Sequence, residues 1–200
     1  KESRLFFQMV RDFLTVYLPK QKASSANTIE SYRTAMNKYL DYSCNELKIG
    51  LDSYTFQHSS RELLEKYLEG METEGNWSVS SRNQRLAAIR RFYRYAAERN
   101  PSVMSCYQEM ALIPVKKEAE REIEFFSEKA LDAILTVPDV SAKKGRRDLV
   151  FMILLYDTGA RIQEMLDLRL NDLHISSDEK YVVLTGKGGK TRLVPLMQKP

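Results

Sequence analysis

Two short stretches decide how this chain is interpreted: YDTGARIQEML at residues 156–166 and TGKGGKTR at residues 185–192. The first places Arg161 directly after a turn of small residues, at the start of an amphipathic helix. The second places lysines and an arginine on a glycine-rich turn between two β-type runs, which predicts a hairpin. An arginine guanidinium can form two parallel hydrogen bonds to phosphate oxygens, and a lysine ammonium supplies a mobile charge and a proton. Together the stretches indicate a site that handles phosphate.

Composition limits the class of protein only loosely. The chain has 200 residues, 43% of them hydrophobic, and a net charge of +4, which permits nucleic-acid binding without requiring it. Cys44 and Cys106 have no paired spacing and are interpreted as free thiols, and His58 and His174 lie too far apart in sequence to suggest a metal site. No apolar run reaches the ~20 residues of a membrane span and no signal peptide is recognised, so we expect a cytoplasmic protein.

The amino-terminal half shows helical periodicity from Leu5 to about Arg99, which predicts a small bundle of four or five helices. The first helix is expected to end near Pro19, and the second to begin at Asn27 as its cap. The third begins at residues 59–62, and the fourth runs from residues 78–81 to Glu98. We assign residues 1–112 to this helical domain.

Residues 113–126 are charged and nearly without apolar anchors, as is typical of a linker. Residues 127–200 form the second predicted domain. Its expected elements are a helix capped by Ser127, a buried helix at 149–156, a helix at 161–168, and strands at 172–175, 181–184 and 192–196. The predicted fold class is therefore mainly α with a small antiparallel β-sheet.

The fourth helix is strongly basic, with six arginines and one acid between Arg82 and Arg99. Its first turn also carries serine, asparagine and glutamine, which suits contact with duplex phosphates and base edges. A solvated polar face is the alternative interpretation. Cations in a first turn oppose the helix dipole, so Arg82 and Arg85 need another reason to be there.

Arg161 and the hairpin lysine each have an ordinary explanation as well. Arg161 could be a surface arginine, although Glu164 one turn ahead is placed to orient its guanidinium. Residues 189–191 end like a nucleotide-binding P-loop, but the leading glycine of that motif is replaced by Leu184, and a strand follows where the motif needs a helix. Two interpretations of this turn remain: an ordinary hairpin tip, or a hairpin that presents Lys187 to a nucleic-acid groove.

The ordered series is more specific than its parts. The turn is followed in order by the arginine, Gln-Glu, Leu-x-Leu, a strand, Gly-Lys-Gly-x-Lys-x-Arg and Val-Pro-Leu. This series resembles the first half of the catalytic domain of the tyrosine recombinase (phage integrase) family. Residues 27–32, 81–86, 89–93 and 100–101 are similar to the helical core-binding domain of that family. The resemblance implies a SAM-like helical bundle followed by a truncated α+β catalytic domain.

Members of that family close round duplex DNA and cut it through a 3′-phosphotyrosyl link, without metal or cofactor. By this resemblance Arg161 would stabilise charge on the phosphate oxygens, and Lys187 would protonate the leaving 5′-oxygen. Glu164 would support Arg161, while Lys190 and Arg192 would brace the hairpin against phosphates. The candidate DNA contacts of the helical domain are Thr28, Tyr32, Ser81, Arg82 and Arg85.

Three elements of the family pattern are missing: the His-x-x-Arg box, a later histidine or tryptophan, and the nucleophilic tyrosine. Residues 58–61 spell His-x-x-Arg but lie in the helical domain, and the last tyrosine, Tyr181, precedes Lys187. We therefore expect these 200 residues to bind double-stranded DNA weakly and not to cut it. The full-length form would recombine DNA and could act as a homo-oligomer on it. The alternatives are a non-catalytic DNA-binding regulator and a helical protein-interaction module.

Overall fold

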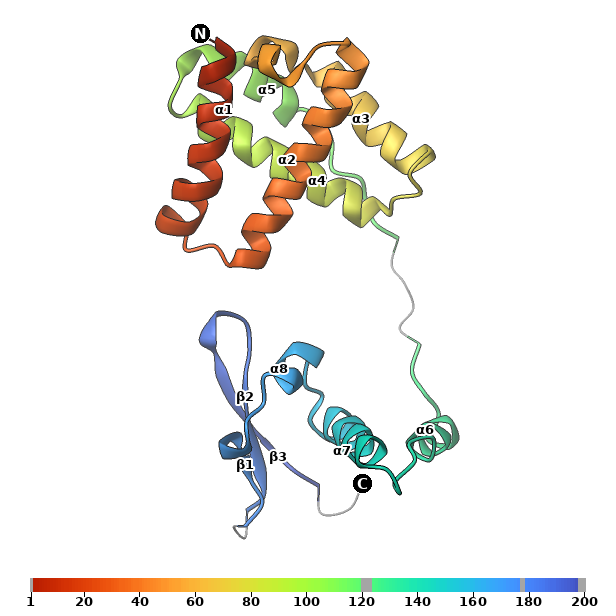
Figure 1. Cartoon of the computed structure of the whole chain (residues 1–200). Helices are drawn as coiled ribbons and strands as arrows, with labels where there is room; N and C mark the ends of the chain where they lie inside the picture. The colour runs from red at the N-terminus through yellow and green to blue at the C-terminus, as the bar shows by residue number, and fades with distance from the viewer. Residues whose placement is uncertain (1, 120–123, 177–178, 198–200) are drawn as a thin grey trace. The chain divides into compact units, whose positions relative to one another are not determined.

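A computed structural model describes residues 2–119, 124–176 and 179–197. The chain divides into two compact units, Lys1–Arg121 and Glu122–Pro200 (Figure 1). The first unit is helical, and the second combines helices with a three-stranded antiparallel sheet. The predicted fold class, mainly α with a small antiparallel sheet, is confirmed.

The first unit is a bundle whose elements cross over a common core (Figure 1). They are α1 (Glu2–Asp12), a π-helical continuation η1 (Phe13–Gln21), α2 (Ala26–Leu47), α3 (Arg61–Thr73), α4 (Val79–Ala97) and α5 (Met104–Ala111), with short 3-10 turns at Leu51–Ser53, Phe56–His58 and Pro101–Val103.

An aromatic cluster fills the core of the helical unit. Phe6 is fully buried and its ring meets those of Tyr54, Phe56 and Phe92 edge-on at centroid distances of 4.8–5.7 Å. Aromatic pairs prefer this geometry and add to the stabilisation that burial gives. Because α4 supplies Phe92 from its middle, it lies at the centre of the bundle.

Two predicted helix boundaries are wrong. The first helix was expected to end near Pro19, but the chain continues in π-helical turns to Gln21, where the buried side chains of Tyr17 and Leu18 hold it against the core. The second helix was expected to be capped by Asn27. Ser25 is the cap instead, since its backbone is extended and its hydroxyl accepts the amide of Thr28 at 3.3 Å.

The arginines of α4 are bonded within the protein. Arg90 donates to the carbonyls of Met110 and Ala111, which satisfies acceptors at the end of α5. The others bond as follows: Arg82 to the Pro114 carbonyl, Arg85 to the Ser31 carbonyl, Arg91 to the Tyr17 hydroxyl, Arg94 to Glu98, and Arg99 to the Tyr95 carbonyl. The basic helix is thus partly a framework that ties other segments to the core.

The start of the predicted linker is docked on α4. Asn83 donates to the carbonyl of Lys116 and accepts its amide, at 2.8 and 3.1 Å. Arg82 donates to the Pro114 carbonyl at 2.8 Å, and the Lys116 ammonium lies 2.6 Å from the carboxylate of Glu72. Residues 114–116 are therefore held by the helical unit, although their composition suggested a free tether.

The second unit contains α6 (Glu128–Leu135), α7 (Lys143–Thr158), α8 (Ile162–Leu166), a 3-10 turn at Leu170–Asp172, β1 (Leu173–His174), β2 (Tyr181–Thr185) and β3 (Thr191–Pro195). The strands pair antiparallel in the order β1-β2-β3, with Thr185 opposite Thr191 beside the hairpin loop. Val182 and Leu184 are fully buried on the face of β2 where α8 packs. This packing places the start of α8 beside the hairpin.

The burial expected for residues 149–156 is not found. They lie in α7, but Val150 and Tyr156 are 56% and 54% exposed, and the intervening apolar side chains are only half-buried. The main helical neighbours of α7 in the described part of this unit are the short helices α6 and α8. With 8 and 5 residues against the 16 of α7, these two neighbours cover only part of its apolar side, which therefore stays partly exposed to solvent.

Candidate active site and nucleic-acid interface

The second unit is organised around one buried carboxylate, that of Glu164. Its side chain is 3% exposed, and it accepts the backbone amide of Arg161 at 2.9 Å and the Arg161 guanidinium at 2.8 Å. From β3, Arg192 donates to both carboxylate oxygens in a forked pair, at 2.9 and 2.7 Å. One acid therefore joins the start of α8 to the hairpin.

The charge of Glu164 is stabilised by its donors. The guanidinium of Arg192 and then the amide of Arg161 lower the pKa of this carboxyl to about 2. The same pair raises the pKa of Arg192. With its pKa lowered in this way, Glu164 is negatively charged at neutral pH, and it holds the Arg161 guanidinium, whose side chain is 75% exposed, at the surface.

Gly186 allows the hairpin to lie close to the Glu164 carboxylate. A Cβ at this position would lie 2.7 Å from the Glu164 carboxylate and 3.7 Å from the Arg161 guanidinium. Real Cβ atoms do not approach oxygen so closely, so only glycine fits without displacement. The Arg161 guanidinium thus lies against the backbone of the residue that precedes Lys187.

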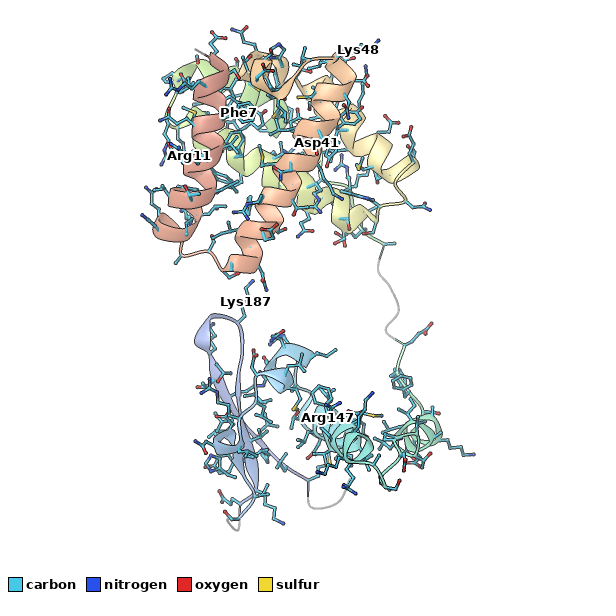
Figure 2. The ribbon with its side chains drawn as sticks, viewed as in Figure 1. Phe7, Arg11, Asp41, Lys48, Arg147 and Lys187 are labelled. Carbon is cyan, nitrogen blue, oxygen red and sulfur yellow. The ribbon has the colours of Figure 1, made fainter. Side chains whose placement is uncertain are left out.

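The hairpin loop gives Lys187 its exposed position. The Gly186 amide bonds to the Lys190 carbonyl at 2.7 Å, and Gly188 and Gly189 adopt positive φ angles of 77° and 73°. Glycine takes that region without steric cost. Figure 2 shows Lys187 at the tip of the hairpin, with its side chain extending beyond the strands. Its ammonium makes no ion pair within the described residues.

The two remaining hairpin candidates differ. Lys190 is exposed and has no ion-pair partner in the part of the chain that the structure describes, so it remains a predicted phosphate contact. Arg192 was predicted to reach phosphates too, but its fork is occupied by Glu164. It braces the hairpin against α8, and because its side chain is still 40% exposed, its contact with phosphate remains a prediction.

Four of the predicted DNA contacts in the helical unit lie near one another. Gln84 and Arg85 in the first turns of α4 donate to the hydroxyl and the carbonyl of Ser31 in α2. Thr28 and Tyr32 lie three residues before and one after Ser31, while Ser81 lies one turn before Arg85. The beginnings of α2 and α4 therefore form one surface, which carries half-buried hydroxyl and guanidinium groups.

Arg82 does not belong to that surface. It is 5% exposed, and its guanidinium bonds to Pro114 and Asn83 and lies 3.8 Å from Glu72. Contact with a phosphate would require these bonds to break. Its presence in a first turn, where the helix dipole disfavours it, is explained by its hold on residues 114–116 and not by a ligand.

Other kinds of site receive no support from the geometry. Cys44 and Cys106 are free thiols, and burial raises the pKa of Cys106 to about 12, which disfavours its thiolate form. Within residues 2–119, 124–176 and 179–197, histidine, cysteine and acidic side chains form no group of three that could hold a metal ion. No helix in that described part has the length and apolar character needed to cross a membrane.

Comparison with known proteins agrees with this geometry. Residues 11–100 match the SAM-like N-terminal domain of phage integrases, and residues 124–200 match the phage integrase family itself. The chain belongs to the phage integrase family. The family resemblance that the sequence suggested is thereby confirmed.

Relatives match over most of this chain but extend well beyond it. A Sinorhizobium fredii protein named as the integrase/recombinase y4rD is 28% identical over 98% of this chain and 70% of its own length. The tyrosine recombinase XerC of Pelotomaculum thermopropionicum is 33% identical over 92% of this chain and 58% of its own length. The crystal structure of the site-specific recombinase XerH bound to its difH substrate shares the fold, with a TM-score of 0.64 at 18% identity, over 98% of this chain and 58% of that one.

Sequence reasoning missed the part that Gly186 plays. The glycine was recognised as a turn residue, whereas the structure shows that it makes room for a carboxylate. A weak signal was present in the sequence, since Gly186 stands just after a predicted strand. Glycine in such a place often marks a close approach.

The depressed pKa of Glu164 predicts an acid-sensitive second unit. Because the folded pKa of about 2 lies below the ordinary 4.5, the carboxylate stabilises the fold fully above pH 4.5, and this contribution is lost as the pH falls toward 2. Urea unfolding followed by the NMR signals of Val182 and Leu184 should show this loss in the wild type. It should be much smaller in Glu164→Gln, while the exposed control Glu124→Gln should behave as the wild type. Equal acid sensitivity in all three proteins would contradict the assignment.

Gly186→Ala should destabilise the second unit by about 1–3 kcal/mol, as overpacking does, because the new Cβ must displace the Glu164 carboxylate. The same urea unfolding experiment measures it. Gly70→Ala in α3 is the control: nothing lies within 4 Å of its Cβ, and alanine should stabilise that helix by up to about 1 kcal/mol. An unchanged stability of Gly186→Ala would refute the close approach.

Proposed function

We propose that this chain is the DNA-binding and partial catalytic portion of a site-specific recombinase or integrase that acts on double-stranded DNA. The observation that carries the proposal is the joint hold of Glu164 on Arg161 and Arg192, which sets an exposed guanidinium against the base of the loop that carries Lys187. In the longer protein, a tyrosine outside these residues would attack the scissile phosphate. The proposed place of action is the cytoplasm.

The proposed chemistry assigns separate work to the two cations. Arg161 stabilises the charge that builds on the non-bridging oxygens of the phosphate, because its guanidinium is preorganised by the buried carboxylate beneath it. Lys187 donates a proton to the departing 5′-oxygen from the hairpin tip, where its side chain is exposed. Neither step needs a metal or an organic cofactor.

The helical unit supplies the grip on DNA in this proposal. Hydroxyls of Thr28 and Ser81, the phenol of Tyr32 and the guanidinium of Arg85 contact the duplex from the joined beginnings of α2 and α4. Trp77 steadies this surface, since Arg85 and Lys38 lie over its ring at 5.2 and 4.9 Å. A homo-oligomer would assemble on DNA in the full-length protein.

The first test is the binding of a fluorescein-labelled duplex of mixed sequence as salt is raised. Each phosphate contact should contribute about −0.9 to the slope of log affinity against log salt, so a steep fall is expected between about 50 and 200 mM salt. A protein-interaction module would show no duplex affinity even at the lowest salt, and that result would end the proposal.

The second test separates a recombinase from a DNA-binding regulator. In the longer protein, Arg161→Ala should lower formation of the covalent DNA complex by about 10²–10³-fold while DNA affinity changes little, because the lost interaction strengthens in the transition state. Arg147→Ala is the control, an exposed arginine on α7 that pairs with Asp148 (Figure 2). Wild-type levels of covalent complex from Arg161→Ala would overturn the assigned role, and none from the wild type would favour the regulator.

A further inference from the structure

A second basic surface lies at the end of η1, away from the first turn of α4. Its charges are those of Lys20 and Lys22, from η1 and the residue after it, and of Arg91 and Arg99, from the end of α4 and just beyond; Lys22, Arg91 and Arg99 lie within 6 Å of the ring of the buried Tyr17. We call these five residues the Tyr17 patch. They come from segments about 75 residues apart in sequence that the fold brings together.

Both arginines of the patch lie close to a tyrosine ring. The Arg91 guanidinium lies 5.6 Å from the centre of the Tyr17 ring and donates to its hydroxyl at 2.6 Å. The Arg99 guanidinium lies 3.9 Å from the centre of the Tyr95 ring, which packs 4.7 Å from Tyr17. Such contacts fix the guanidiniums before any ligand arrives, so little entropy is lost when an anion binds.

The positive charge of the patch is poorly neutralised. Lys20 and Lys22 are exposed, and neither forms an ion pair within the described residues. Glu98 lies 3.1 Å from Arg94 and 3.9 Å from Arg99, and Asp12, whose charge adds to burial in raising the pKa of Tyr95, lies 3.7 Å from Arg11. Since Glu98 already pairs with Arg94, most of the charge of the patch is open to an outside anion.

The patch continues into the surface formed by α2 and α4. The ring of Phe13 lies 5.7 Å from that of Tyr17 and 5.5 Å from that of Tyr32, a candidate DNA contact. Along the chain, the amide of Lys22 bonds back to the Tyr17 carbonyl, and three residues later Ser25 caps α2. The two surfaces are therefore linked beneath by the buried ring of Phe13, and residues 22–25 of the chain join them directly.

We propose that the Tyr17 patch is a second phosphate-contacting surface, which extends the duplex footprint of the helical unit from the beginnings of α2 and α4 to the end of η1. The inference rests on the proposed DNA binding. Phosphate backbone is the partner because the patch offers preorganised guanidiniums and mobile ammoniums but no large exposed apolar anchor of the kind that protein interfaces use. Its contacts would raise affinity for every sequence equally.

The test compares salt dependence of duplex binding for three forms of this chain. Lys20→Gln/Lys22→Gln should lower the magnitude of the salt slope by about 1.8, that is about 0.9 for each lost phosphate contact, and weaken binding alike for all sequences. The control is Lys48→Gln/Lys66→Gln. Lys48 lies at the far end of α2 (Figure 2). The rise of the helix puts it about 30 Å from Thr28. The control should keep the wild-type slope.

The outcomes are distinct. A wild type with no duplex affinity at low salt defeats the proposed function and this inference with it. A wild type that binds, with the same slope in Lys20→Gln/Lys22→Gln, overturns this inference alone. A second readout is NMR: titration with duplex should shift side-chain signals of Arg91 and Arg99 in the wild type but leave Lys48 unmoved, and unshifted arginines would count against the patch.

Discussion

The second unit depends on the ionised carboxylate of Glu164. Burying a charge is costly unless it is paired and hydrogen-bonded, and here the amide of Arg161, its guanidinium and the fork of Arg192 supply the donors. These donors come from the start of α8 and from β3. The carboxylate can therefore receive all of them only when the helix and the hairpin are correctly aligned with each other. The buried Glu164 thus positions the exposed Arg161 guanidinium and the hairpin that carries Lys187.

Much of this arrangement could be predicted from the sequence, because local signals decided it. Pro and Gly at the ends of helices, the serine cap at residue 127, and alternation in β2 and β3 gave the elements nearly where they stand, although α3 is capped by Ser60 and not by Ser59, where its predicted capping box began. Glu164 was expected to orient Arg161 because three residues separate them on a helix. Each of these inferences involves groups close together in the chain.

The rest required the fold. Arg192 was assigned to phosphate because nothing in the local sequence reveals that Glu164, 28 residues earlier, would occupy its fork. Arg82 was assigned to DNA because a first-turn arginine looks exposed in sequence, whereas Glu72 and Pro114 enclose it. Asn27 lost its capping role to Ser25 since two residues compete for one helix end. Long-range partners, not residue types, decide such cases.

The bonds from α4 to residues 110–116 also bear on how the chain folds during synthesis. Arg82, Asn83 and Arg90 are translated before the carbonyls and the amide that they bind. Domains generally fold in the order in which the ribosome releases them. Once α1 to α4 have assembled, the side chains that bind α5 and the segment after it are already in place. The helical unit can therefore finish folding as α5 and residues 112–116 emerge, before the second unit has been made.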